Sequence, residues 1–241
     1  MAPRSGQKSF YERPTMKTAM ILAAGRGERL RPLTHHMPKA LCSLLSKPLI
    51  AHHLRHLVQS GYQKVIINHA YLGGQIRHWV RHETFGDLEI HFSPEPPGGL
   101  ETGGGIIHAL PLLGSEPFLT INADIFTDYD LINLHLPQGS LVHVVLVNKP
   151  SYRRVGDYGL SANGLLNNEE KAYIFSGITA YHPNFFKQAT PGRYSVTPMI
   201  RQAANQALVS GELYHGVWFD IGTATQLLMA EETLEKTAKP I

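Results

Sequence analysis

From Met16 onward, short apolar runs alternate with segments of helical period, and this alternation constrains the fold more than any other feature. The short apolar runs are typical of buried strands, and the segments between them place apolar residues three and four positions apart. The expected strands are 18–23, 64–68, 88–92 and 118–121, and the expected helices between them are 48–61, 74–82 and 103–113. Two strands that are connected through a helix usually pair in parallel within one sheet. The sequence therefore predicts an α/β chain with a Rossmann-like, doubly wound and mostly parallel mixed sheet.

The second half of the chain is richer in strand signals. The expected elements are strands at 141–147, 172–181 and 213–219, a turn-rich hairpin near 158–163, and helices at 196–208 and 223–236. No Pro/Gly/Ser-rich linker separates the two halves. We therefore expect residues 16–241 to form one domain with a smaller β-rich lobe.

Composition excludes several classes of protein. The chain is 43% hydrophobic and 17% charged, which does not fit a disordered protein. No run approaches the ~20 apolar residues of a membrane helix, and the N-terminus lacks a secretory pattern. The single cysteine, Cys42, excludes a disulfide scaffold and favours a reducing compartment. These observations predict a cytoplasmic protein without a membrane partner.

The excess of positive charge does not indicate a nucleic-acid-binding protein. The formal net charge is +3, and residues 1–15 contribute +2 of it. Those residues show no helical or strand period, and Met16 begins a second plausible start. We therefore interpret 1–15 as a disordered upstream or expression-derived extension. The remaining chain is almost neutral, so we expect no nucleic acid partner.

A glycine-rich, basic segment follows the first expected strand. It reads LAAGRGERLRP over 22–32, with PKAL at 38–41. Glycines at the carboxyl end of a strand let backbone N–H groups approach phosphates, and Arg29 and Lys39 add positive charge. Leu30 stands where a GxGxxG motif needs its third glycine, and no GxxxxGK[ST] occurs, so the usual dinucleotide and P-loop sites are excluded.

Asp124 and Asp220 each follow an apolar strand. Two such carboxylates at one edge of a sheet suit Mg²⁺, which takes one or two carboxylates together with phosphate oxygens and water. Each aspartate would equally serve as the cap of a following turn or helix. The spacing alone leaves both interpretations open.

These motifs together resemble the signature of the sugar-1-phosphate nucleotidylyltransferases. The resemblance covers residues 17 to about 235, including INHAYLGGQI (67–76), FSPEPPGGLETGGGI (92–106), INADIFTDYD (121–130), GDYGL (156–160), FSGITAYHP (175–183) and WFDIGT (218–223). Three positions depart from the family pattern: Ala123 replaces a glycine, PKAL replaces PKPL, and Glu170-Lys171-Ala172 stands where many relatives have Glu-Lys-Pro. Ala123 would add a Cβ close to the expected ligand.

The resemblance implies a role for each matching residue. Asp124 and Asp220 would hold Mg²⁺ and, with Arg29 and Lys39, form the catalytic set. The nucleotide would contact Ala24, Gly25, Gly27, Glu28, Arg29, Lys39, Glu95, Gly99 and Gly103. The sugar would contact Asn122, Asp157, Ser176 and Gly177. The loop around Glu95 is also rich in proline and glycine, so turn formation alone would explain it.

The implied reaction transfers UMP from UTP to a sugar 1-phosphate and releases pyrophosphate. Within the family, the compact chain most resembles the members that act on N-acetylmuramate α-1-phosphate in peptidoglycan recycling. Alternatives are a mannose 1-phosphate guanylyltransferase, a glucose 1-phosphate thymidylyltransferase, and a non-catalytic nucleotide-sugar sensor. We expect a monomer or a small homo-oligomer.

The 14 histidines include two pairs at i, i+4 spacing, His52 with His56 and His78 with His82. A zinc site would need a third ligand, and the sequence contains no HExxH motif. We interpret both pairs as solvated helix faces.

Overall fold

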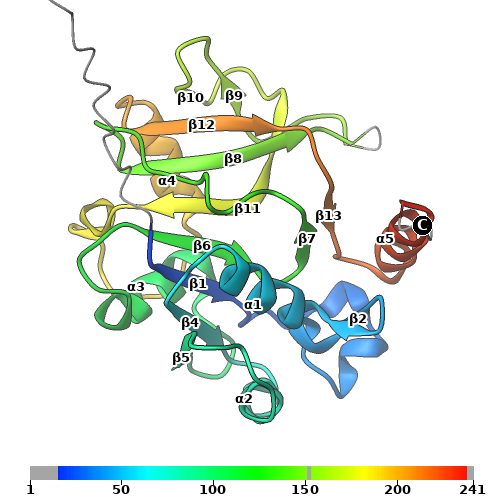
Figure 1. The fold of residues 1–241 in the computed structure, drawn as a ribbon. Coiled ribbons are helices and arrows are strands. Elements are labelled where there is room, and N and C mark those ends of the chain that lie inside the picture. The colour runs from blue at the N-terminus through cyan, green and yellow to red at the C-terminus, as the bar shows by residue number, and fades with distance from the viewer. Residues whose placement is uncertain (1–15, 151–152, 238–241) are drawn as a thin grey trace, which may run out of the picture.

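The computed structural model describes residues 16–150 and 153–237, and a seven-stranded sheet forms its centre (Figure 1). Across the sheet the order is β12 (Val209–Tyr214), β8 (Val142–Asn148), β11 (Tyr173–Tyr181), β6 (Phe118–Asn122), β1 (Thr18–Leu22), β4 (Lys64–His69) and β5 (Glu89–Pro94). Among these strands only β11 runs against its neighbours. The predicted fold class is confirmed, and the β-rich second half continues the same sheet. The predicted extension, 1–15, lies outside the described residues.

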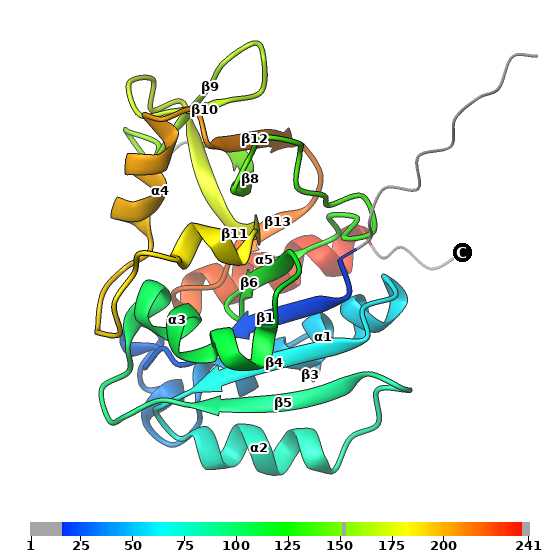
Figure 2. The same ribbon diagram turned by 90° about the vertical axis from the view of Figure 1, so that its left-hand side faces the viewer.

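Helices cover both faces of this sheet, because successive strand residues point to opposite sides. They are α1 (Leu49–Gln59), α2 (Gly73–Arg81), α3 (Glu101–Leu113) and α4 (Thr197–Ala204). Ala19 and Ile21 of β1 belong to the core under α1 and α2, whereas Met20 belongs to the core under α3 and α4. Figures 1 and 2 show α3 and α4 on the side of the sheet opposite α1. Among the described residues, no helix combines the length and apolarity needed to cross a membrane.

The long segment after β1 is held by the C-terminal helix. It contains the 3₁₀ turns η1 (Glu28–Leu30), η2 (Leu33–His35) and η3 (Lys39–Leu41), the short strands β2 (Ser43–Leu44) and β3 (Lys47–Pro48), and it packs on α5 (Ala224–Thr237). Leu30 and Leu44 share a core with Leu227 and Ala230 of α5. The C-terminal helix thereby fixes the basic segment singled out from the sequence.

Two small ribbons and one short turn complete the chain. They are β7 (Ile125–Thr127) with β13 (Trp218–Asp220), β9 (Gly159–Leu160) with β10 (Leu166–Asn167), and η4 (Pro183–Phe186). The expected hairpin is present as β9–β10, with its second strand beyond residue 163. Strand β7 and its pairing with β13 were not predicted, because a three-residue strand carries too little periodicity to be recognised.

Two predicted elements were wrong in their extent. The predicted helix 196–208 ends at Ala204, because Ala207 has a left-handed backbone (φ 55°) and the chain then enters β12. The predicted strand 213–219 is split between β12 and β13. The chain bends at Gly216, where a Cβ would overlap the ring of Tyr214.

The histidine interpretation holds for one pair. His78 and His82 on α2 are exposed. The interpretation was wrong for His52 and His56, which are half-buried. Nε2 of His52 lies 2.9 Å from the carbonyl oxygen of Leu44, so this ring packs against the segment that precedes α1.

The glycines that open α3 provide room for another segment. The N–H groups of Gly103 and Gly104 both donate to the carbonyl of Tyr194, at 2.9 and 3.1 Å. A Cβ on Gly103 would lie 2.9 Å from Tyr194, and a Cβ on Gly104 would overlap the carbonyl oxygen of Gly192. This close approach anchors the 192–194 segment to the start of α3.

We predict that Gly104→Ala lowers the free energy of unfolding by about 1–3 kcal/mol, because the new methyl must displace backbone atoms. Gly74→Ala is the matched control, because a Cβ there meets only Arg77 Nη2, at 4.0 Å. That control should stay within about 1 kcal/mol of wild type. Urea denaturation measures the stability of both variants. Equal midpoints for the two would contradict the close packing of Gly104 against the 192–194 segment.

Candidate active site

A cavity of about 540 Å³ opens at the carboxyl ends of the central parallel strands. Such an edge is where open α/β sheets bind ligands. Of the residues predicted to contact the nucleotide, it is lined by Ala24, Gly25, Gly27, Glu28 and Gly99. Asn68 at the end of β4 and Asn122 at the end of β6 complete the wall. Arg29, Lys39, Glu95 and Gly103 do not line this cavity.

Gly27 shapes the loop after β1. Its backbone is left-handed (φ 64°), and its carbonyl accepts a 2.7 Å hydrogen bond from the Thr34 hydroxyl. A Cβ there would lie 3.0 Å from both Lys39 Cβ and Thr34 Cγ2. Glycine therefore allows the loop to fold over Lys39 without a clash.

Glu95 lies behind the cavity wall and braces it. Its Oε1 accepts from Asn68 Nδ2 at 2.6 Å, and its Oε2 accepts from the Leu100 N–H at 2.6 Å. Asn68 in turn accepts from the Ala23 N–H at 2.7 Å. This chain of hydrogen bonds ties the ends of β1, β4 and β5 to the loop that follows β5. Gly105 leaves room for it, because a Cβ there would lie 2.5 Å from Glu95 Oε1.

A second cavity, of about 250 Å³, adjoins the first. Of the predicted sugar residues it is lined by Asn122, Asp157 and Ser176, and of the predicted catalytic residues by Arg29, Asp124 and Asp220. Asn122 and Asp124 line both cavities. A ligand in one cavity is therefore adjacent to a ligand in the other at these two residues.

The β7–β13 ribbon brings the two predicted metal ligands together. Asp220 pairs with Ile125, the neighbour of Asp124, and the Ile221 N–H donates to the Asp124 carbonyl at 2.8 Å. Burial and the nearby Asp124 carboxylate raise the pKa of Asp220, while Lys39, Arg29 and Arg153 oppose that shift. The ammonium of Lys39, whose side chain is only 12% exposed, lies 2.6 Å from Asp124 Oδ2.

This pair of carboxylates fits a divalent cation. Burial first, and the Asp124 carboxylate second, raise the pKa of Asp220, and a bound cation would favour the charged form of this carboxylate. Within the described ranges, no group of three or more His, Cys, Asp or Glu residues forms a possible metal site. Mg²⁺ favours such an arrangement, in which the protein supplies two carboxylates and phosphate oxygens and water fill the remaining coordination positions.

The predicted sugar residues lie around the bulge in β11. Gly177 has φ 87° there, and a Cβ would lie 2.9 Å from Asn122 Nδ2. Asp157 accepts from the Phe175 N–H at 3.1 Å, which fixes its carboxylate at the cavity. The Ser176 hydroxyl is buried and donates to the Val145 carbonyl at 2.7 Å, so that oxygen is engaged within the sheet.

The substitution of alanine for the family glycine at 123 is accommodated. Ala123 is 4% exposed and its side chain belongs to the core under α1 and α2. His53 of α1 lies nearby, and burial lowers its pKa to about 4, so the ring beneath Ala123 and Asp124 is neutral at physiological pH.

Sequence reasoning missed several residues of the site. Asn68 ends the predicted strand 64–68, and the tendency of open α/β sheets to bind ligands at the carboxyl ends of strands would have singled it out. Arg153 lies 3.4 Å from Asp157 and lines the second cavity, and Arg193 lines the first. Both arginines come from irregular segments, where no periodic pattern marks them.

We predict that Glu95→Gln lowers the free energy of unfolding by about 1–3 kcal/mol, because an amide cannot accept from both Asn68 and Leu100. Chemical denaturation measures the loss. Glu83→Gln, an exposed site, is the control and should not differ from wild type. If the two variants were equally stable, Glu95 would not be the brace of this wall.

Comparison with known proteins agrees with this geometry. Residues 18–237 match the family described as nucleotidyl transferase. The chain is 41% identical over 222 residues to an N-acetylmuramate alpha-1-phosphate uridylyltransferase of Neisseria meningitidis serogroup B, covering 88% of this chain and 96% of that protein. It is 32% identical to the protein of the same name from Caulobacter vibrioides, covering 90% and 97%.

A solved structure supports the fold. The inositol-1-phosphate CTP transferase from T. maritima superposes with a TM-score of 0.80 over 95% of this chain and 99% of that one, at 14% identity. At that identity the likeness concerns the fold alone. The family match and the two relatives carry the assignment: this chain belongs to the nucleotidyl transferase family and is a sugar-1-phosphate nucleotidyltransferase.

Proposed function

We propose that this chain transfers UMP from UTP to N-acetylmuramate α-1-phosphate, giving UDP-N-acetylmuramate and pyrophosphate in a Mg²⁺-dependent reaction. The observation that carries the proposal is the junction of two cavities at Asn122 and Asp124, beside Asp220. Such a junction suits a reaction that joins two phosphate-bearing substrates. The relatives from Neisseria and Caulobacter support the choice of base and sugar.

In this reaction an oxygen of the sugar phosphate attacks the α-phosphorus of UTP, and the bond from that phosphorus to the bridging oxygen of the β-phosphate breaks. The attacking oxygen is already ionised at neutral pH, so the chain need not supply a general base. The obstacle is the alignment of two anions, and positioning in adjacent cavities supplies ~7–11 kcal/mol of such a barrier.

The charged residues would have separate roles in aligning the two substrates. Arg29 lines the sugar cavity, where its guanidinium would hold the sugar phosphate or the α-phosphate. Lys39 would balance the charge that develops as pyrophosphate departs. Asp124 and Asp220 would hold Mg²⁺, which reduces the repulsion between the two phosphate groups when it is bound.

The loop glycines would receive the nucleotide. Ala24, Gly25 and Gly27 line the first cavity with their backbone, which allows close approach of a ribose and phosphates. Gly99 lines the same cavity and precedes Leu100, whose N–H donates to Glu95. We therefore assign to Glu95 the positioning of the loop that reads the base. Asn122, Asp157 and the Ser176–Gly177 bulge would hold the sugar.

A cytoplasmic role in the recycling of peptidoglycan sugars is part of the proposal. Free UTP is a cytoplasmic substrate, and UDP-N-acetylmuramate is a precursor from which cell wall is built. The buried single cysteine is consistent with a reducing compartment.

We predict that Asp124→Asn loses at least ~10²-fold in kcat at saturating Mg²⁺, because the metal loses a charged ligand and Lys39 loses its partner. Pyrophosphate release in a coupled assay measures the rate. Asp87→Asn, an exposed carboxylate on another loop, is the matched control and should keep the wild-type rate. Near wild-type turnover by Asp124→Asn would show that the metal is held elsewhere.

The substrate assignment is tested by kcat/KM for UTP, dTTP, CTP, ATP and GTP, each with N-acetylmuramate, N-acetylglucosamine, mannose and glucose 1-phosphates. We expect the highest value for UTP with N-acetylmuramate 1-phosphate. Preference for GTP with mannose 1-phosphate, or for dTTP with glucose 1-phosphate, would replace the proposed reaction by one of those. Pyrophosphate release with none of the pairs would favour a non-catalytic sensor.

A further inference from the structure

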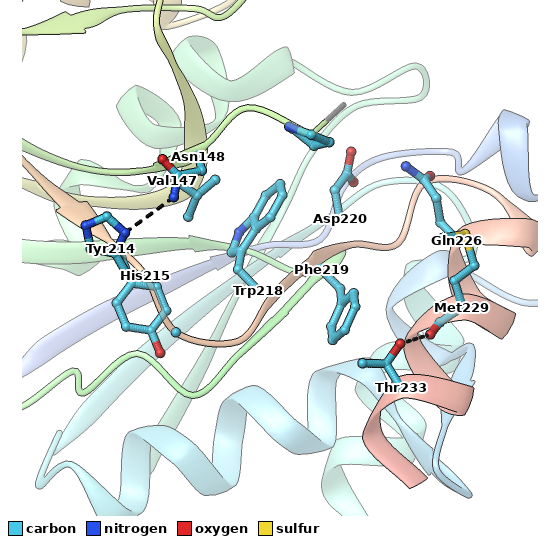
Figure 3. Close-up of a pocket in the computed structure, with 12 residues that line it drawn as sticks. Val147, Asn148, Tyr214, His215, Trp218, Phe219, Asp220, Gln226, Met229 and Thr233 are labelled. Carbon is cyan, nitrogen blue, oxygen red and sulfur yellow. Dashed lines mark hydrogen bonds between the residues drawn. The ribbon is translucent and has the colours of Figure 1, made fainter. Parts of the chain in front are cut away.

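A third cavity, of about 290 Å³, lies next to the sugar cavity between β13 and α5 (Figure 3). The two cavities share Pro150, Trp218 and Asp220 as lining residues. We call the third cavity the side pocket. Because Trp218 and Asp220 border both spaces, the sugar cavity and the side pocket adjoin at these residues.

The side pocket has a rigid aromatic wall. The indole N–H of Trp218 donates to the Ser176 carbonyl at 2.8 Å, which fixes the ring. The backbone before it is held as well, because Asp128 accepts hydrogen bonds from the Val217 N–H, at 2.8 Å, and from the Tyr214 hydroxyl. A wall fixed in this way can discriminate between ligands by shape.

The interior is apolar and the rim has hydrogen-bond donors. Phe219 and Met229 line the side toward α5. Asn148 and His215 lie on the opposite side of the Trp218 ring from Asp220, with Asn148 Nδ2 3.3 Å from His215 Nδ1 (Figure 3). The pocket therefore suits a short branched carbon group that carries an acceptor.

N-acetylmuramate differs from N-acetylglucosamine by one such group, a lactyl ether with a methyl and a carboxylate. We propose that the side pocket receives this lactyl group and thereby selects N-acetylmuramate 1-phosphate over N-acetylglucosamine 1-phosphate. The inference rests on the proposed function. The methyl packs against the Trp218–Phe219 wall, and the carboxylate turns toward the Asn148 and His215 side chains, where Asn148 offers an N–H donor.

Met229→Trp tests the inference by filling the pocket. Met229 is 58% exposed on α5, so the larger side chain does not disturb a core. Leu228→Trp is the matched control: Leu228 is 59% exposed, precedes Met229 on the same helix and does not line the pocket. Thermal denaturation checks that both variants stay folded.

The measurement is the Kd of each sugar 1-phosphate, by calorimetry with Mg²⁺ and a non-hydrolysable UTP analogue, together with kcat/KM for turnover. We expect Met229→Trp to weaken the binding of N-acetylmuramate 1-phosphate by ~10–100-fold and that of N-acetylglucosamine 1-phosphate by less than about 3-fold. Leu228→Trp should change neither value.

Equal effects of Met229→Trp on the two sugars, or no effect on either, would overturn the inference while leaving the proposed reaction intact. Wild-type protein that binds and turns over N-acetylglucosamine 1-phosphate but rejects N-acetylmuramate 1-phosphate would overturn both. A third outcome is that Met229→Trp selectively loses N-acetylmuramate 1-phosphate binding while the wild type binds this sugar but releases no pyrophosphate. That result would support the pocket and contradict the reaction.

Discussion

The site depends on the meeting of two carboxylates, Asp124 and Asp220, whose mutual repulsion the surrounding structure must overcome. The β7–β13 ribbon forces them together through backbone pairing, and Lys39 offsets part of the charge from 2.6 Å. Lys39 holds that position because its loop is clamped between the sheet and α5. Burial, together with the nearby Asp124 carboxylate, raises the pKa of Asp220. A pair of carboxylates in this setting suits a divalent cation, which can in turn bind phosphate oxygens.

The two substrate sides are built by different structural means. The parallel strands end together and supply the glycine loop, Asn68 and the Glu95 brace, which form one cavity. The other cavity needs the reversal of β11, because its bulge at Gly177 places the backbone against Asn122. The single antiparallel strand among these seven is thus the element that adds the second cavity beside the first.

The sequence predicted the sheet well because each central strand is a distinct apolar run followed by a helical period. It predicted Asp124 and Asp220 as candidates, but only the resemblance favoured ligation over capping. The bracing role of Glu95 could not be predicted from the sequence, because its hydrogen bonds to Asn68 and Leu100 join residues that no spacing rule relates. The bend at Gly216 was missed because apolar residues lie on both sides of it, at 213–214 and 217–219. Motifs predicted the kind of chemistry, whereas long-range hydrogen bonds determine which residues line the cavities.

The central claim is that Asp124 and Asp220 hold one divalent cation where the two cavities meet. The most direct measurement is the anomalous scattering of Mn²⁺ in a crystal grown with UDP-N-acetylmuramate. We expect one anomalous peak between the two carboxylates, with the uridine over the glycine loop and the sugar beside Asp157. An anomalous peak elsewhere, or a product bound while Asp124 and Asp220 remain without metal, would contradict the account.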